Sequence, residues 1–199
     1  LNGTCNYILT QMRRRKITFV VALQEAQEKG YAESDPSLDV NGDDTGHKLT
    51  ILTALAFGVH RRGNGLPVTG ITGLSPIDLE MAEELGYRLR LLGVARQSVH
   101  GLEQFVGPCM VPLNSPLAII EDVENGILLH GDRVGRLLLM GRGAGAEPTA
   151  TAVVADVIDL ATGRLMPSLA QSLLGGRDLP LANPETITAQ YYLRLSVSD

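Results

Sequence analysis

Apolar residues follow a helical period in the first part of the chain. They predict three helices, over residues 3–16, 17–31 and 43–60. Thr4 and Thr18 are placed to cap the first two helices, and Gly30 is placed to stop the second. The third pattern is apolar nearly all round, which predicts that this helix is buried.

The later pattern changes to alternation, which is typical of strands. A short helix over residues 75–87, with Ser75 as its cap and Pro76 in its first turn, separates the two regions. Strands are then predicted over residues 87–98 and 102–113, followed by a hairpin over 126–141 and an amphipathic helix over 146–164. Because helices precede strands, the predicted fold class is α+β, with helices packed on a mixed, mostly antiparallel sheet.

The composition is that of an ordinary globular protein, with 44% hydrophobic and 20% charged residues. A net charge of −5 argues against nucleic acid or an anionic membrane surface as a partner. No run approaches the roughly 18 apolar residues of a membrane span, and no signal-peptide pattern is present. Two cysteines, Cys5 and Cys109, are too few for a disulfide framework or a metal cluster. We therefore expect packed thiols, no metal site and a cytoplasmic location.

The stretch "GYAESDPSLDVNGDDTGHK", residues 30–48, gathers five carboxylates ahead of one lysine. Asp44 and Lys48 are four residues apart on a predicted helix, so they share a face. A structural interpretation is available, because the helix dipole favours anions at an N-terminus by about 0.3–1 kcal/mol each. An exposed Asp44–Lys48 pair would add little. Spacing alone favours this interpretation.

Residue choice supports a chemical interpretation of the same stretch. Only three of the 17 basic residues are lysines, namely Lys16, Lys29 and Lys48. Arginine keeps its proton in proteins, whereas lysine can give its proton up when its surroundings are tuned. A proton donor to a developing alkoxide needs that property. The neighbouring carboxylates could bind a substrate ammonium, which suggests a small cationic or zwitterionic substrate with a reducible or oxidisable oxygen.

A second motif, "GRGAGA" at residues 141–146, matches the glycine pattern of a dinucleotide phosphate turn. Such a turn is followed by a strand that ends in an acidic residue about 20 residues later, and no such strand is predicted here. We therefore interpret the motif as a glycine-rich turn at which the backbone approaches another group closely.

Three segments together resemble the homoserine dehydrogenase family: "LNGTCNYILTQM", "EAQEKGYAESDPSLDVNGDDTGHKLTIL" and "GRGAGAEPTATAVVADVIDL". The resemblance implies an oxidoreductase that interconverts L-homoserine and L-aspartate-4-semialdehyde with NADP or NAD, on the route to threonine, methionine and isoleucine. It also implies the fold of that family's catalytic domain, small-molecule substrates as partners, and a homodimer.

The resemblance carries catalytic roles onto the acidic stretch. Lys48 would donate a proton to the aldehyde oxygen, or accept it in the reverse direction. Glu33 and Asp44 would hold the substrate amino group and a neighbouring water. Asp39 would be a supporting carboxylate of the substrate site.

The resemblance also implies contacts made outside these charged residues. Gly3, Thr4 and Tyr31 would line the substrate pocket. Gly30 and Gly143 would approach the nicotinamide side of the cofactor.

The resemblance divides the chain into four parts. They are a substrate-binding, catalytic and dimerisation domain (1–145), a helix returning to a nucleotide-binding domain absent from this chain (146–163), a linker (164–188) and the start of a truncated ACT-like domain (189–199). The chain starts without methionine and ends in a strand-like pattern, so we expect both ends to be cuts and these residues alone to be inactive. The alternative is a non-catalytic amino-acid-binding or dimerisation module, whose residues 87–141 supply an intersubunit sheet.

Overall fold

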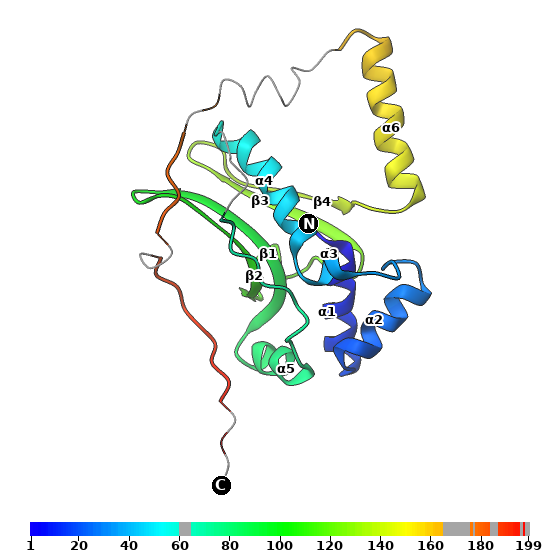
Figure 1. Ribbon diagram of the computed structural model, residues 1–199, viewed down its shortest axis with the longest axis vertical. Helices are drawn as coiled ribbons and strands as arrows, with labels where there is room; N and C mark the ends of the chain where they lie inside the picture. Colours follow the sequence, from blue (N-terminus) through cyan, green and yellow to red (C-terminus); the bar gives the residue numbers. More distant parts are fainter. Residues whose placement is uncertain (60–64, 165–175, 177, 184–186, 196, 198–199) are drawn as a thin grey trace.

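The computed structural model describes residues 1–59, 65–164, 176, 178–183, 187–195 and 197 (Figure 1). The helices are α1 (Gly3–Arg15), α2 (Phe19–Glu28), α3 (Ser37–Val40), α4 (Asp43–Phe57), α5 (Pro76–Glu84) and α6 (Ala146–Ala161). The strands are β1 (Tyr87–Ser98), β2 (Gly101–Pro112), β3 (Glu124–Gly131) and β4 (Gly135–Arg142). The helices and strands expected from the sequence are present, and the short helix α3 is an addition to them.

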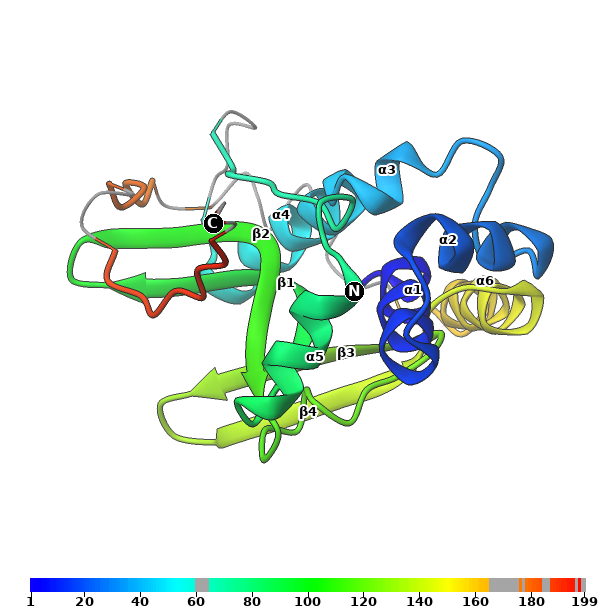
Figure 2. The same cartoon turned by 90° about the horizontal axis from the view of Figure 1, so that it is seen from below.

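The strands form two antiparallel ribbons (Figures 1 and 2). β1 pairs with β2 along its whole length, with Tyr87 opposite Pro112. β3 pairs with β4 up to the turn, where Gly131 lies opposite Gly135, so the hairpin predicted there is confirmed. Parallel pairing is limited, in the part of the chain that the structure describes, to isolated bridges. The α+β class and the mostly antiparallel pairing are therefore confirmed.

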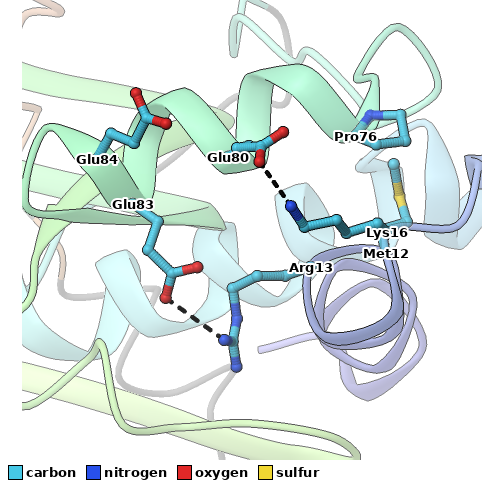
Figure 3. Close-up of a pocket in the computed structure, with 7 residues that line it drawn as sticks. All are labelled: Met12, Arg13, Lys16, Pro76, Glu80, Glu83 and Glu84. Atoms are coloured by element: carbon cyan, nitrogen blue, oxygen red, sulfur yellow. Dashed lines mark hydrogen bonds and ion pairs between the residues drawn. The ribbon is translucent and has the colours of Figure 1, made fainter.

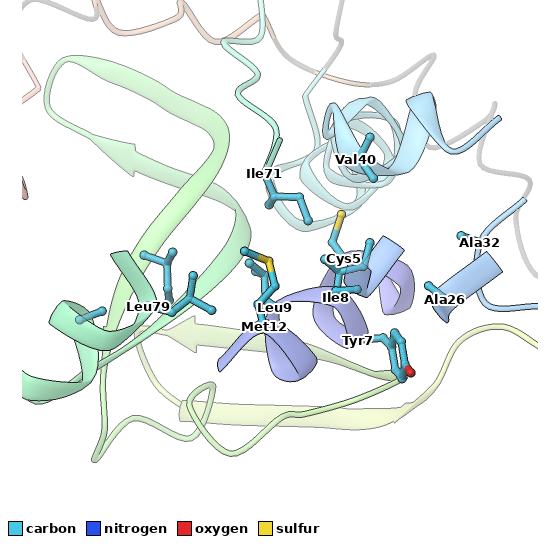
Figure 4. Packing of buried hydrophobic residues seen from close by; sticks show 13 residues of the cluster. Cys5, Tyr7, Ile8, Leu9, Met12, Ala26, Ala32, Val40, Ile71 and Leu79 are labelled. Carbon is cyan, nitrogen blue, oxygen red and sulfur yellow. The ribbon is translucent and has the colours of Figure 1, made fainter. Parts of the chain in front are cut away.

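Helix α1 lies at the centre of the hydrophobic core. Ile8, Leu9 and Met12 of this helix are at most 1% exposed. They lie among apolar side chains of α2, α3, α5 and the segment before α5, and Figure 4 shows Cys5 of α1 close to Ile71 of that segment. Burying a large apolar side chain contributes about 1.5–3 kcal/mol. The middle turns of α1 are therefore held firmly by packing.

The beginning of α1 corrects one prediction, because its N-cap is Asn2 and not Thr4. The Asn2 Oδ1 atom accepts the backbone N–H of Cys5 at 2.8 Å. Thr4 lies inside the first turn, and its hydroxyl donates to the Tyr31 carbonyl at 2.7 Å. Asparagine and threonine are both good caps. Since the helix begins at Gly3, only Asn2 stands at the capping position.

Helix α4 is less buried than its apolar sequence predicts. It packs on β1 and β2 along one side, which carries the buried Leu49 and Ala54. Ile51 and Leu55, on the other side, are 47% and 55% exposed. The prediction of a fully buried helix is therefore wrong for that side, which presents apolar side chains to solvent.

The segment that precedes α5 is hydrogen-bonded to the end of α3 on one side and to β2 on the other. The Ile71 N–H donates to the Val40 carbonyl at 2.9 Å, and the Thr69 N–H donates to the Val106 carbonyl at 2.9 Å. Between α3 and α4 the chain turns at Gly42, whose φ of 90° is a left-handed conformation that suits glycine. Backbone hydrogen bonds thus tie the end of α3 to β2.

Helix α6 stands apart from the other elements (Figure 1), and none of its residues is buried. Its large apolar side chains are each more than half exposed, namely Val153, Val154, Val157, Ile158 and Leu160. Across the described ranges, no helix has both the length and the apolar character needed to cross a bilayer.

Most of the predicted linker, residues 164–188, lies outside the described residues. One described part of it contacts the tip of β2, where the Leu102 N–H donates to the Pro180 carbonyl at 2.9 Å. Of residues 189–199, those described adopt neither helix nor strand, and Arg194 forms an ion pair with Asp78 at 3.0 Å. The assignment of residues 189–199 to a truncated ACT-like domain stays a prediction.

We expect Gly70→Ala to destabilise the protein by about 1–3 kcal/mol, the usual cost of an overpacked site. A Cβ atom there would overlap the Val40 carbonyl oxygen and lie 2.6 Å from the Asn41 Cα atom, and backbone cannot move aside cheaply. Gly73→Ala is the matched control, because a Cβ at Gly73 meets nothing within 4 Å. Urea unfolding followed by circular dichroism measures both, and equal midpoints for the two variants would contradict the packing described here.

Candidate functional site

Three of the predicted site residues meet at the N-terminus of α1. The Asn2 Nδ2 atom donates to Asp39 Oδ1 at 2.6 Å and to Asp44 Oδ2 at 2.9 Å. Lys48 Nζ donates to the same Asp44 Oδ2 atom at 2.8 Å. The prediction that Asp44 and Lys48 share a helix face is confirmed. We call Asn2, Asp39, Asp44 and Lys48 the amide–carboxylate cluster.

Packing of α4 determines which of its side chains face this cluster. Thr45 and Leu49 lie against Gly93 of β1, where a Cβ atom would be 3.2 Å from the Thr45 methyl group. That contact turns Asp44 and Lys48 toward α1. The Lys48 side chain is 49% exposed and that of Asp44 is 29% exposed, so both can be reached from solvent.

Lys48 keeps one donor available for a ligand. Besides Asp44, its ammonium contacts the Leu1 carbonyl oxygen at 3.2 Å. An ammonium has three N–H donors. Since these two oxygens are its only hydrogen-bond partners within the described ranges, one N–H remains free to meet a substrate oxygen.

The structure does not bring the Glu33 carboxylate into the cluster. Glu33 is exposed, and its backbone carbonyl accepts from Gln27 Nε2 at 3.0 Å. Its carboxylate makes no hydrogen bond or ion pair to any residue that the structure describes. The role implied for Glu33 therefore stays a prediction, with a side chain that is free to turn toward a ligand.

Tyr31 and Thr4 do lie together beside the cluster. The Thr4 hydroxyl bonds to the Tyr31 carbonyl, and the Tyr31 ring lies 5.0 Å from the ring of Tyr7. Tyr31 remains 44% exposed, so it can be reached from solvent. Gly30, with φ of 73°, ends α2 as predicted, and a Cβ atom there would meet nothing within 4 Å.

Gly3 and Gly143 lie against the same side chain, that of Asn125 on β3. A Cβ atom at Gly143 would be 2.8 Å from Asn125 Nδ2, and one at Gly3 would be 3.0 Å from the Val123 carbonyl oxygen and 3.6 Å from Asn125 Nδ2. Close approach to backbone therefore accounts for Gly3, whereas Gly143 approaches the end of a side chain that can move. The interpretation of "GRGAGA" as a turn where the backbone approaches another group stays a prediction.

Sequence reasoning missed Asn2 and Asn125. The signal for Asn2 was present, because asparagine before a helical pattern is a strong N-cap candidate. Its bonds to Asp39 and Asp44 join residues 37 and 42 positions apart, and no local pattern reports such contacts. Asn125 had no signal, since it lies just before the hairpin predicted over residues 126–141.

Cys5 lies directly beneath the cluster. Its thiol is fully buried and donates to the Asp39 carbonyl oxygen at 3.1 Å. Burial, with the nearby Asp39 charge, raises the pKa of the Cys5 thiol far above its usual range. Burial also raises the pKa of Cys109 to about 11. Both cysteines are free thiols, and Cys5 serves as packing rather than as a nucleophile.

A hollow with none of the cluster residues lies between α1 and α5 (Figure 3) and has a volume of about 200 Å³. Four of its charged side chains form ion pairs within the hollow, Lys16 with Glu80 at 2.6 Å and Arg13 with Glu83 at 3.6 Å. It contains none of the predicted site residues. We assign it no chemistry, because it lies apart from the amide–carboxylate cluster and the ion pairs within it occupy most of its charged groups.

A smaller hollow adjoins the cluster and is lined in part by Leu1, Asn2 and Asn6. Its volume of about 40 Å³ suits water rather than an amino acid. The described residues therefore present the cluster without enclosing a substrate. Among these residues, no group of three or more His, Cys, Asp or Glu side chains is placed to hold a metal ion.

Comparison with known proteins gives one consistent result. A family model described as homoserine dehydrogenase matches residues 1–158. The chain is 43% identical over 205 residues to a homoserine dehydrogenase of Neisseria gonorrhoeae, and 43% identical over 199 residues to one of Helicobacter pylori. Both alignments cover the whole chain and 47% of the relative. The chain thus spans about half the length of the curated relatives it matches.

Solved structures agree with the sequence comparison. A homoserine dehydrogenase of Thiobacillus denitrificans matches with a TM-score of 0.86 and 43% identity, over 94% of this chain and 44% of that one. A hyperthermophilic archaeal homoserine dehydrogenase mutant, solved in complex with NADPH, matches with a TM-score of 0.66 and 27% identity. That alignment covers 83% of this chain and 46% of the other.

We expect neither cysteine to react quickly with iodoacetamide at pH 8 in the folded protein. Both pKa values are raised by folding, so the reactive thiolate is scarcer in the folded state than in the unfolded state. In urea both thiols should label fast, as mass spectrometry would show. A Cys109→Ser variant isolates Cys5, and rapid labelling of Cys5 without denaturant would contradict its burial beneath the cluster.

Proposed function

This chain belongs to the homoserine dehydrogenase family, and from that premise we propose that the whole protein interconverts L-aspartate-4-semialdehyde and L-homoserine with NADP or NAD. The reaction would serve threonine, methionine and isoleucine biosynthesis in the cytoplasm. The observation that carries the proposal is the accessible Lys48 ammonium held on Asp44 beside further carboxylates.

Lys48 is assigned the proton transfer at the substrate oxygen. Reduction of an aldehyde places negative charge on oxygen, and an ammonium in hydrogen-bond reach can supply the proton. The third N–H of Lys48 is left for that oxygen, since the other two donate to Asp44 and Leu1. In the oxidation direction, the neutral amine accepts the hydroxyl proton.

The carboxylates of the cluster are assigned the binding of the substrate ammonium group. Asp39 and Asp44 lie side by side, and each retains lone pairs beyond those used by Asn2 and Lys48. Glu33 is exposed and can add a third carboxylate when a ligand is present. Charge-assisted hydrogen bonds to carboxylates are the stronger kind, which suits recognition of an amino acid.

Bound nicotinamide cofactor would supply the hydride. The residues present fit such a group in one respect, because a Cβ atom at Gly30 would meet nothing within 4 Å, which leaves the backbone there open. At Gly143 a Cβ atom would be 2.8 Å from the Asn125 side chain, so a cofactor contact there would use the backbone. The archaeal relative that holds NADPH supports this class of cofactor.

Two exposed apolar surfaces of the described residues are assigned as contacts with other parts of the enzyme. The exposed apolar side of α6, residues 146–161, suits packing on a nucleotide-binding domain outside residues 1–199. The exposed Leu137, Leu139 and Met140 of β4 suit a homodimer contact. Residues 1–145 would then form the substrate-binding, catalytic and dimerisation domain.

Replacement of Lys48 by alanine in the full-length protein should lower kcat by on the order of 10²-fold or more with little change in KM, because proton transfer is lost. NADPH oxidation with aspartate-4-semialdehyde measures it. Lys16→Ala is the matched control, since Lys16 pairs with Glu80 away from the cluster. Equal kcat in Lys48→Ala and wild type would make Lys48 a structural ion pair.

Residues 1–199 expressed alone should show no turnover with NADPH, because the small hollow beside the cluster does not enclose a substrate. The same assay, with the full-length protein as reference, measures this. Turnover by residues 1–199 alone would contradict the proposal that the active site needs parts of the protein outside them. An inactive full-length protein that still binds an amino acid would favour the non-catalytic module.

A further inference from the structure

The amide of Asn2 makes three hydrogen bonds and is 7% exposed. Its oxygen accepts the Cys5 N–H, and its nitrogen donates one hydrogen to Asp39 and the other to Asp44. The opposite orientation would set the oxygen against two carboxylates and the NH₂ group against a backbone N–H. The network therefore fixes which end of the amide faces the carboxylates.

Two carboxylates that bond to one nitrogen atom are close neighbours and repel each other. In such a pair, one group tends to take up a proton unless donors stabilise both charges. Asn2 supplies one neutral donor to each carboxylate, and it does so without adding charge. The amide therefore holds Asp39 and Asp44 next to each other without a counter-charge of its own.

Asn2 is linked to both hydrogen-bond partners of Lys48, Asp44 and Leu1. Asp44 Oδ2 accepts from both Asn2 Nδ2 and Lys48 Nζ, so Asn2 sets the orientation of the carboxylate on which Lys48 rests. The carbonyl of Leu1, the residue before Asn2, is the other partner of Lys48. A change at Asn2 must therefore alter the electrostatic surroundings of Lys48.

We propose that Asn2 is a positioning residue that holds Asp39 and Asp44 side by side on one amide and thereby holds Lys48 in place for proton transfer. Its role in turnover rests on the proposed function, whereas its effect on the charges of the cluster does not. The charged and titratable groups that face it are Cys5 on α1, Asp39 on α3, and Asp44 and Lys48 on α4. Arg90 of β1 and Glu124 of β3 line the hollow beside it.

Two substitutions at Asn2 should shift the pH at which Lys48 loses its proton in opposite directions. Asn2→Ser keeps an oxygen that can cap α1 but removes both amide donors, so Asp44 loses its orientation. Lys48 should then lose its proton at a lower pH than in wild type. Asn2→Asp also keeps the capping oxygen but adds a third carboxylate, so Lys48 should lose its proton at a higher pH.

Nitrogen NMR of the lysine side chains in the full-length protein measures this titration. The portion described here holds only Lys16, Lys29 and Lys48, and Lys→Arg variants assign each signal. Lys16 and Lys29 should not shift in either Asn2 variant. The double variant Asn2→Asp/Asp39→Asn restores one amide and two carboxylates, and it should return Lys48 toward its wild-type titration.

Turnover provides the second readout. Asn2→Ser should lower kcat roughly 10- to 100-fold, the factor expected when hydrogen bonds to charged groups are lost. Thr18→Ala, which removes the cap of α2 away from the cluster, controls for a plain loss of helix capping. Thermal unfolding by circular dichroism shows whether each variant is folded.

The outcomes separate the inference from the proposed function. Opposite shifts of Lys48 with rescue in the double variant support the inference even if the wild type does not turn over, in which case the proposed function fails alone. An unchanged Lys48 titration in both folded single variants overturns it and leaves Asn2 as a helix cap. Shifts in the same direction also overturn it, because they indicate general disruption.

Discussion

One buried amide joins the hydrophobic core to the charged residues. Asn2 caps α1 with its oxygen and binds Asp39 and Asp44 with its nitrogen. The helix that it caps is fixed by its own buried side chains, which lie at the centre of the core (Figure 4). The two carboxylates therefore take their positions from the packing of α1, even though they belong to the acidic loop and to α4.

The same constraint explains which parts of the site the sequence could predict. Asp44 and Lys48 are one helical turn apart, so the local period was enough to bring them together. Asn2 reaches carboxylates 37 and 42 residues away, and such contacts follow from tertiary packing alone. Thr4 was predicted as the N-cap of α1, but Asn2 is an equally good capping residue, and the position where the helix starts decides between them.

Whether an apolar helix side is buried depends on the elements that pack on it, which the local sequence does not show. The apolar side of α4 with Ile51 and Leu55 suggested burial, yet the structure leaves that side exposed. The fold class was predictable because helices precede strands along the chain. The close approach of Gly3 and Gly143 to Asn125 was not, since glycine in a turn has many possible reasons.

A crystal structure of the full-length protein with homoserine and oxidised cofactor tests the central claim most directly. The account predicts Lys48 Nζ within about 3 Å of the homoserine hydroxyl oxygen, with the substrate ammonium on Asp39, Asp44 or Glu33. Asn2 should keep both of its carboxylate partners in that complex. Homoserine bound away from Lys48, or a Lys48 ammonium turned from the hydroxyl while still paired with Asp44, would contradict the account.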